Sequence, residues 1–278
     1  MMTLSDGRRL GYEMVGEGTP IVLVAGTGCD RRFWRLQVEE YAKRHRVITV
    51  DMRGAGQSTV ALDVESYTSE SMADDVAELV EALDLGPVHL AGHSLGSCIV
   101  QQFGIRHGRL ARSLQLHATW AYADEWLRRA FIGTTRFAME HGDLRQTLRT
   151  VLMWMLSPEY LESRPPGTVS DMVAHCFIDN PHLQANAGML GHLRADEKHD
   201  TRALLGGLEM PVLVTAGEQD LLIPARYGQV VAELIPSSRY HEFRGPGSTH
   251  GANWEMVEEF NEVTSRFLDE ADREVAVG

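Results

Sequence analysis

Apolar and polar positions follow two different periods along this chain. Up to about residue 120, and again from residue 211, short apolar runs alternate with segments in which apolar residues recur at helical spacing. Short apolar runs bounded by glycine-rich turns are typical of strands that are buried on both faces. The alternation therefore predicts an α/β fold with a mostly parallel sheet and helices on both of its faces. The segments that indicate strands most clearly are 21–24, 47–50, 88–91, 114–116, 212–216 and 240–243.

Between residues 120 and 205 the strand signal disappears and apolar residues recur at helical spacing only. Prolines at positions 158, 165, 166 and 181 divide this segment into about four helices, because proline neither continues a helix nor allows helical geometry in its predecessor. We therefore expect a core formed by residues 1–119 and 206–278, with residues 120–205 inserted as a helical cap. After Leu268 we expect a short frayed tail.

The segment from Gly92 to Gly96 has the pattern G-x-S-x-G and lies between the strand-like run 88–91 and a helix-like run at 98–103. A serine on a sharp turn from strand to helix is held in a strained backbone conformation, and the positions two before and two after it must be small. Gly92 and Gly96 meet that requirement, so we expect a nucleophile elbow that presents Ser94. The alternative is an ordinary glycine-rich turn.

Further polar or glycine-rich segments follow other strand-like runs. Residues 25–28, with the sequence Ala-Gly-Thr-Gly, follow one strand, and residues 51–58 follow the next. Near the C-terminus, residues 217–220 end a strand at Asp220, and His250 lies in the loop after the last strand. Serine, acid and histidine in this order along the chain is the order of an α/β-hydrolase.

The chain resembles the α/β-hydrolase superfamily from an early Asp-Gly turn to its last helix. Residues 51–58 match the family's D-x-R-G-x-G-x-S turn, residues 217–220 match its G-x-x-D turn, and residues 250–255 match its H-x4-E ending. The resemblance implies an eight-stranded sheet with a cap between the sixth and seventh strands. Three positions depart from the family pattern, namely Ala25 in place of a histidine, Ser97 in place of a glycine and Thr249 in place of a glycine. The first departure bears on how the oxyanion loop is supported and on the class of substrate.

The residue types predict nucleophilic catalysis. A serine hydroxyl is a poor nucleophile at neutral pH, so it needs a base, and the base needs an acid that fixes its tautomer and stabilises its cation. We expect Ser94, His250 and Asp220 to fill these roles. We expect the backbone amides of Thr27 and Leu95 to form the oxyanion hole.

Two other acids could take the place of Asp220, which would then be a helix or turn cap. These are Glu218, in the same turn, and Asp124, after the sixth strand. We expect His93 to be a packing and hydrogen-bonding residue of the elbow, because the residue before the nucleophile points away from it.

The apolar residues of the cap predict a pocket for a bulky and largely apolar ligand, although helical caps also need a core of their own. The substrate-binding residues that we expect are Gly26, His117, Trp120, Trp126, Trp154 and Met155. For His117 a supporting role behind the pocket is an equal alternative.

We expect no metal and no cofactor. His192, Asp196 and His199 are loosely clustered, but their spacing fits no tight helical metal site, and the charged stretch 194–200 is predicted to be solvated. The pattern around Gly26 is not a dinucleotide fingerprint, because the later glycine and acidic residue are out of place.

Composition narrows the setting of the protein. With 278 residues, of which 44% are hydrophobic, the chain can bury one large core with a cap. Its 26 basic and 39 acidic residues give a net charge of −13, which argues against nucleic-acid or anionic-membrane partners. We expect a small-molecule substrate, no membrane segment, a cytoplasmic location and reduced thiols at Cys29, Cys98 and Cys176, and leave a homodimer open.

Together these features predict a serine hydrolase that cleaves an ester, thioester or lactone through an acyl-enzyme. A serine at the elbow disfavours the dehalogenases and epoxide hydrolases of the family, which place an aspartate there. Three alternatives use the same scaffold: hydrolysis of a carbon-carbon bond in a diketone, a non-hydrolytic cyclisation or elimination, and binding of a small ligand as a receptor.

Overall fold

The computed structural model describes residues 1–141, 151–163 and 186–277. Its centre is an eight-stranded sheet with the strand order β1-β2-β4-β3-β5-β6-β7-β8. Strands β1 and β2 pair antiparallel with their neighbours, and the pairs from β4 to β8 are parallel. This confirms the predicted fold class. The strands are β1 (Met2–Thr3), β2 (Arg9–Val15), β3 (Thr19–Val24), β4 (His45–Asp51), β5 (Val88–His93), β6 (Ala111–His117), β7 (Val212–Gly217) and β8 (Ser238–Phe243).

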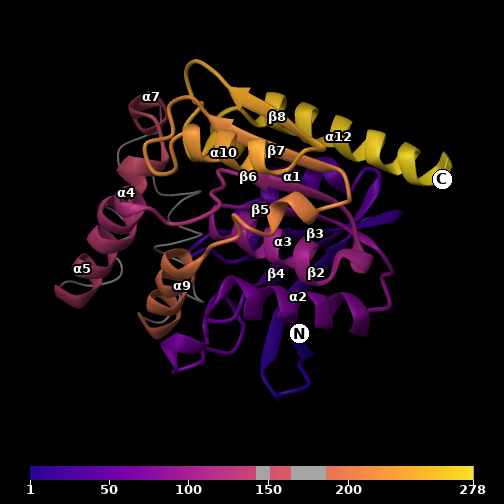
Figure 1. The fold of residues 1–278 in the computed structure, drawn as a ribbon, viewed down its shortest axis with the longest axis horizontal. Helices are drawn as coiled ribbons and strands as arrows, with labels where there is room; N and C mark the ends of the chain where they lie inside the picture. The colour runs from indigo at the N-terminus through magenta and orange to yellow at the C-terminus, as the bar shows by residue number, and fades with distance from the viewer. Residues whose placement is uncertain (142–150, 164–185, 278) are drawn as a thin grey trace.

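Helices cover both faces of the sheet (Figure 1), so its central strands are buried on both sides. Every residue of β5 is buried, as is the run Ile21–Val24 of β3. Such strands read as continuous apolar runs, which is why the sequence pattern located them. The helices of the core are α1 (Arg35–Tyr41), α2 (Ser69–Ala82), α3 (Leu95–Arg106), α10 (Arg226–Leu234), α11 (Ala252–Glu255) and α12 (Val257–Val277).

The described part of the segment between β6 and β7 is mostly helical, and one isolated antiparallel bridge in it joins Tyr122 to Asp200. It contains α4 (Glu125–Leu127), a π-helical turn at Arg128–Gly133, α5 (Thr134–His141), α7 (Pro158–Glu162) and α9 (Asn186–Lys198). Figure 1 shows these helices together, on the side toward which the arrowheads of β7 and β8 point. They therefore lie over the carboxyl ends of the strands, where loops carry functional side chains in α/β folds. The part of the predicted cap that contains Pro165, Pro166 and Pro181 lies outside the described residues, as does Cys176.

The C-terminal segment differs from the prediction of a frayed tail after Leu268, because α12 continues to Val277. Leu268 and Ala271 are buried against the core, and Glu270 forms an ion pair with Arg239 of β8. This packing holds the additional turns of the helix, whose exposed face is too polar for the sequence pattern to reveal them.

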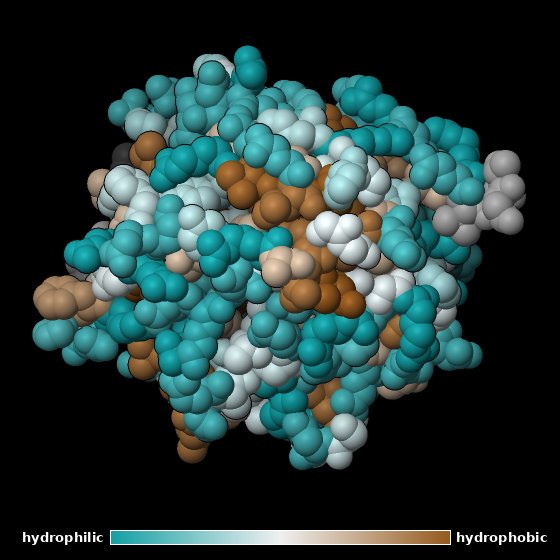
Figure 2. Space-filling view, viewed as in Figure 1, coloured by the Kyte–Doolittle hydropathy of each residue, from teal (hydrophilic) through white to brown (hydrophobic). Residues whose placement is uncertain are grey.

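The surface in the view of Figure 2 is mostly hydrophilic and has one hydrophobic area near its centre. Among the residues that the structure describes, no helix combines the length and hydrophobicity that crossing a membrane requires.

Candidate active site

Ser94 lies between the end of β5 and the start of α3, in a backbone conformation with φ 55° and ψ −125°. A positive φ is rare for a residue other than glycine, and it marks a strained turn. A Cβ atom on Gly92 would clash with the backbone of Gly96, and one on Gly96 would clash with the carbonyl oxygen of Val24. The two glycines thus allow β5, α3 and β3 to approach closely enough to hold this turn.

His250 and Asp220 lie at the ends of neighbouring loops and face each other. The Nδ1 atom of His250 is 2.8 Å from Oδ2 of Asp220, and both side chains are buried. The other carboxylate oxygen, Oδ1, accepts hydrogen bonds from the amides of Leu222 and Ile223, each at 2.8 Å. The carboxylate is therefore fixed by the backbone, and it can in turn fix the orientation and tautomer of the imidazole ring.

The alternative acids lie elsewhere. The Glu218 carboxylate is exposed and accepts a hydrogen bond from the amide of Gly245. Asp124 caps α4 through the amide of Leu127, and its carboxylate accepts a hydrogen bond from the Tyr227 hydroxyl at 2.8 Å. Of the three acids, only Asp220 contacts His250 in the described part of the chain.

Ser94 and His250 line the same cavity, which has a volume of about 20 Å³. This is room for about one water molecule. Gly26 forms part of its wall, and a Cβ atom there would lie 3.0 Å from the Cβ atom of Ser94. No acidic residue, lysine or arginine is among the lining residues that the structure describes, which are Gly26, Thr27, Cys29, Phe33, His93, Ser94, Phe131, Val151, Met155, Met189, Leu222 and His250.

The two expected oxyanion residues flank this cavity from different elements. Thr27 lies in the loop after β3 and is one of the lining residues. Leu95 is the first residue of α3, so its amide is one of the free donors at the helix N-terminus. Both positions suit the stabilisation of an anion beside Ser94.

His93 supports the elbow, as predicted. Its Nε2 atom donates a hydrogen bond to the backbone carbonyl of His250 at 2.8 Å, and the two rings are in edge contact, with centroids 4.6 Å apart. Burial lowers the pKa of His93 well below its ordinary value, so the ring is neutral. It therefore positions the His250 loop by packing and hydrogen bonding.

Neither His117 nor Trp120 lines the cavity at Ser94. Trp120 therefore differs from the expectation that it binds substrate, whereas His117 has the supporting place behind the pocket that was its equal alternative. His117 hydrogen-bonds to the Thr215 hydroxyl and packs on Phe260, and burial lowers its pKa to about 3. Trp120 is 1% exposed and packs edge-on against the His199 ring. Both side chains therefore pack in the core behind the site.

The remaining residues that we expected to bind substrate differ in where they lie. Met155 lines the cavity at Ser94, and Trp154 lines an adjoining cavity of about 30 Å³. The two cavities share the side chains of Phe131, Val151 and Leu222 as walls. Trp126 lines neither cavity, because it is 48% exposed and lies near the Arg226 guanidinium.

The sequence interpretation missed two residues of α9 that contact the oxyanion loop. The stretch 194–200 was predicted to be solvated, but Asp196 is fully buried and its Oδ2 atom accepts a hydrogen bond from Thr27 Oγ1 at 2.7 Å. His192, also buried, accepts a hydrogen bond from the amide of Gly28 at 3.3 Å. Burial raises the pKa of Asp196 to about 7. The two residues are four positions apart, the spacing of one helix face, and this signal could have indicated a shared contact.

Glu255 joins the cap to the loop that carries His250. Its carboxylate accepts hydrogen bonds from Thr249 Oγ1 at 2.6 Å and from the amide and hydroxyl of Ser157, the residue that caps α7. The amide of Gly251 also donates to the Met155 carbonyl at 2.8 Å. The cap is thus attached directly beside the candidate base.

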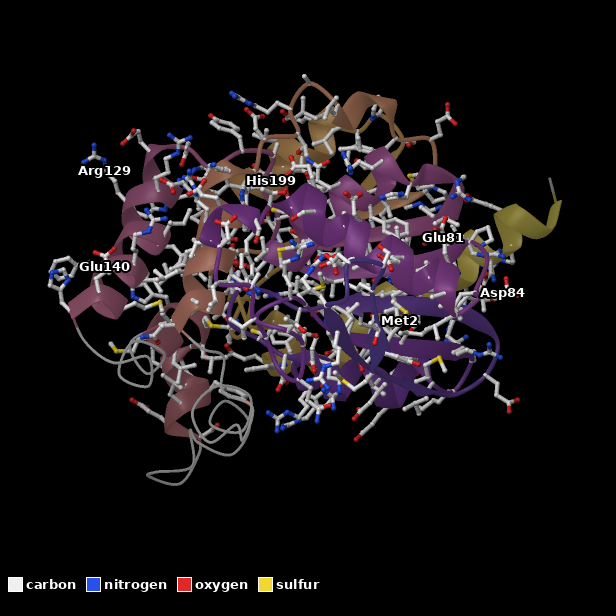
Figure 3. All side chains as sticks on the ribbon, turned by 90° about the horizontal axis from the view of Figure 1, so that it is seen from below. Met2, Glu81, Asp84, Arg129, Glu140 and His199 are labelled. Carbon is white, nitrogen blue, oxygen red and sulfur yellow. The ribbon has the colours of Figure 1, made fainter. Side chains whose placement is uncertain are left out.

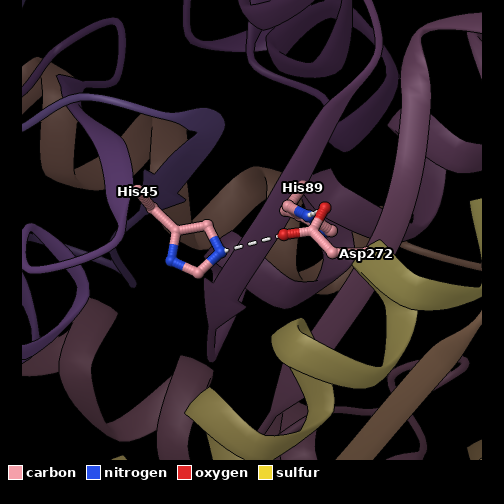
Figure 4. A group of neighbouring side chains, drawn as sticks. All are labelled: His45, His89 and Asp272. Carbon is pink, nitrogen blue, oxygen red and sulfur yellow. Dashed lines mark hydrogen bonds and ion pairs between the residues drawn. The ribbon is translucent and has the colours of Figure 1, made fainter. Parts of the chain in front are cut away.

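A second group of titratable residues lies away from this site, at the start of the strands (Figure 4). His45 and His89 approach the carboxylate of Asp272 in α12, at 3.4 Å and 3.1 Å. Residues of these types could hold a cation, but Arg112 is 3.5 Å from the same carboxylate and already supplies a positive charge. Burial lowers the pKa of His89 to about 4, so the group is a polar network, which includes the Arg112–Asp272 ion pair and ties α12 to β4, β5 and β6.

Comparisons with known proteins identify the family of this fold. A family model described as "alpha/beta hydrolase fold" matches residues 19–255. The "Putative carbamate hydrolase RutD" of Azorhizobium caulinodans is 32% identical over 266 residues, which cover 94% of this chain and 96% of the relative.

Two solved structures extend the comparison. The enol-lactonase of Burkholderia xenovorans LB400 is 25% identical, with a TM-score of 0.85 over 96% of this chain and 99% of its own. A thermophilic esterase of Thermogutta terrifontis is also 25% identical, with a TM-score of 0.82 over 97% of each chain.

Proposed function

This chain belongs to the alpha/beta hydrolase family, and we propose that it hydrolyses an ester, thioester or lactone of an apolar small molecule, with Ser94 as nucleophile. The observation that carries the proposal is the buried pair of His250 and Asp220, which shares a cavity with a serine on a strained elbow. A serine hydroxyl, a base and an oriented acid are the groups that acyl transfer requires.

In the proposed reaction, His250 Nε2 takes the proton of the Ser94 hydroxyl as Oγ attacks the substrate carbonyl. The Asp220 carboxylate, 2.8 Å from Nδ1, stabilises the imidazolium that forms. The amides of Thr27 and Leu95 stabilise the negative charge on the carbonyl oxygen. The leaving group receives the proton from His250. In the second half of the reaction His250 takes a proton from water, whose oxygen attacks the acyl carbonyl, and then returns that proton to Ser94 as the acid is released.

The cavity supports an apolar substrate. Its wall combines aromatic, methionine and aliphatic side chains, and His93, which also lines it, is neutral. In the present conformation the volume of about 20 Å³ is too small for an acyl chain, so the cap residues over it must move when a substrate enters. The shared walls at Phe131, Val151 and Leu222 would let the two cavities join.

A carbamate is a second candidate substrate. The relative that is 32% identical bears the name of a carbamate hydrolase, and it matches nearly the whole chain. Attack on a carbamate carbonyl forms the same kind of tetrahedral intermediate and would use the same residues. With an aryl carbamate the leaving group is again the phenol, and the intermediate is a carbamoyl-enzyme, which water cleaves to the carbamic acid.

The test is a panel of substrates hydrolysed by the parent protein and by the Ser94→Ala variant. The panel contains nitrophenyl esters of increasing chain length, lactones, an aryl carbamate and a vinylogous diketone. We expect turnover of at least one ester or lactone that rises with acyl length and disappears in the variant. Cleavage of the carbamate alone would favour the second candidate, and cleavage of the diketone alone would replace the proposal with carbon-carbon hydrolysis.

A further inference from the structure

Asp196 is a buried carboxyl that belongs to the cap and contacts the oxyanion loop. It lies on α9 with 0% exposure, and its Oδ2 atom accepts the hydrogen bond of Thr27 Oγ1 at 2.7 Å. Its other oxygen, Oδ1, has no hydrogen-bond partner among the described residues. Burying a carboxyl group with one contact is unfavourable, so the position needs an explanation beyond helix packing.

The helix that carries Asp196 is docked by close backbone contacts. A Cβ atom on Gly188 would clash with the Gly54 carbonyl, and one on Gly191 would clash with the ring of Tyr67. His192 donates from Nε2 to the Arg53 carbonyl at 2.8 Å. These contacts place α9 against the loops that follow β3 and β4. His199, just beyond the helix (labelled in Figure 3), hydrogen-bonds to Ser69 of α2 at 2.9 Å.

Within the oxyanion loop, the Cys29 amide donates a hydrogen bond to the Gly26 carbonyl at 3.1 Å, and the Cys29 thiol contacts the Thr27 carbonyl at 3.6 Å. Neither contact involves the Thr27 side chain. Thr27 lies between two glycines, and Gly28 has a φ of 76°. Glycine leaves a backbone free to adopt many conformations. Ala25, the residue before this glycine pair, has no polar side chain that could brace the loop. From the cap, the loop is held by Asp196 on the Thr27 hydroxyl and by His192 on the Gly28 amide.

Resting on the proposed function, we propose that Asp196 is a positioning residue of the oxyanion hole. Its carboxyl holds the Thr27 side chain and so directs the Thr27 amide toward the carbonyl oxygen of the substrate. Because this contact comes from α9, the oxyanion hole is complete only when the cap is docked. The transition state is then fully stabilised only in the conformation in which the cap is docked.

Five single variants and one double variant test this role. Asp196→Ala and Thr27→Val each remove the hydrogen bond, whereas Asp196→Asn and Thr27→Ser keep an acceptor and a donor in place. Ser69→Ala is the matched control, since it removes a buried hydrogen bond at the same end of α9 without touching the oxyanion loop. The double variant Asp196→Ala/Thr27→Val shows whether the two residues act through one contact.

The readout is the reaction with a nitrophenyl phosphonate, which forms a bond from Ser94 to phosphorus and releases one nitrophenolate per active serine. The amplitude counts active sites, and the rate constant reports stabilisation of the charged oxygen. Loss of a complete oxyanion donor costs about 10²- to 10³-fold, so misdirecting one should cost about tenfold to a hundredfold. We expect Asp196→Ala and Thr27→Val to lower this rate and kcat, with full amplitude and a KM within about twofold of the parent.

Further outcomes support or overturn the role. We expect Asp196→Asn and Thr27→Ser to react faster than Asp196→Ala and Thr27→Val, because they retain an acceptor and a donor. Ser69→Ala should react like the parent, and the double variant should be no slower than the slower single one. The role of Asp196 would be overturned if Thr27→Val reacts at the parent's rate. It would also be overturned if the fold-loss of the double variant equals the product of the two single fold-losses. If Asp196→Ala does not fold, Thr27→Val decides. A parent that releases no nitrophenolate would instead refute the proposed function itself.

Discussion

Replacing Asp196 by asparagine should stabilise the folded protein at alkaline pH. Burial raises the pKa of this carboxyl from 3.8 to about 7. Between these values the folded state holds a proton that the unfolded state has released, so the stability of the parent falls as pH rises through this window. Each pKa unit corresponds to about 1.36 kcal/mol. Ionisation of Asp196 therefore lowers the free energy of unfolding by about 4 kcal/mol above pH 7, and about 3 kcal/mol of this loss occurs between pH 5 and pH 8.

Asparagine does not titrate and can accept the same hydrogen bond from Thr27. The unfolding temperature of Asp196→Asn, measured relative to the parent by circular dichroism, should therefore rise by about 5 °C between pH 5 and pH 8 for a chain of this length. Glu197→Gln is the control on the same helix. Burial tends to raise the pKa of Glu197, but its ion pairs with Arg136 and Arg194 hold that pKa below the ordinary value. The difference in unfolding temperature between Glu197→Gln and the parent should therefore not change above pH 5. If the unfolding temperature of Asp196→Asn relative to the parent is equally independent of pH, the reasoning is refuted.

Three further predictions follow from the site. Asp220→Asn should lower kcat about 10⁴-fold, because the wrong tautomer of His250 is then favoured, while Glu218→Gln should remain within about twofold in the same ester assay. Trp154→Ala should flatten the rise of kcat/KM with acyl length, since Trp154 lines the second cavity, and Trp126→Ala, which lies outside both cavities, should leave the slope unchanged. Glu255→Gln should speed proteolysis of the cap by removing a charged acceptor of Ser157, and unchanged cleavage would contradict that role.

The strands and the elbow could be predicted from the sequence because their signals are local. Strands β3 and β5 are buried on both faces and therefore read as apolar runs, and the elbow needs its glycines within five residues. The pairing of His250 with Asp220 followed from chain order in a known scaffold, and the structure brings the two side chains together.

The missed features depend on contacts between distant segments. The charged composition around Asp196 indicated a solvated surface, and its burial arises only when α9 docks on loops more than 130 residues earlier in the chain. His117 and Trp120 have side chains that suit a pocket, but the packing of α12 and of the loop at His199 decides that they face the core. Side-chain direction at a strand end cannot be read from residue type.

Labelling with a fluorophosphonate tests the central claim most directly, because the probe reacts preferentially with an activated serine. We expect one probe per chain, on the peptide that contains Ser94, and no labelling of Ser94→Ala, whose unfolding temperature should stay within about 3 °C of the parent because the change removes one oxygen. Asp220→Asn should label slowly at the same serine. Probe on another residue, or full ester turnover by a folded Ser94→Ala variant, would contradict the account.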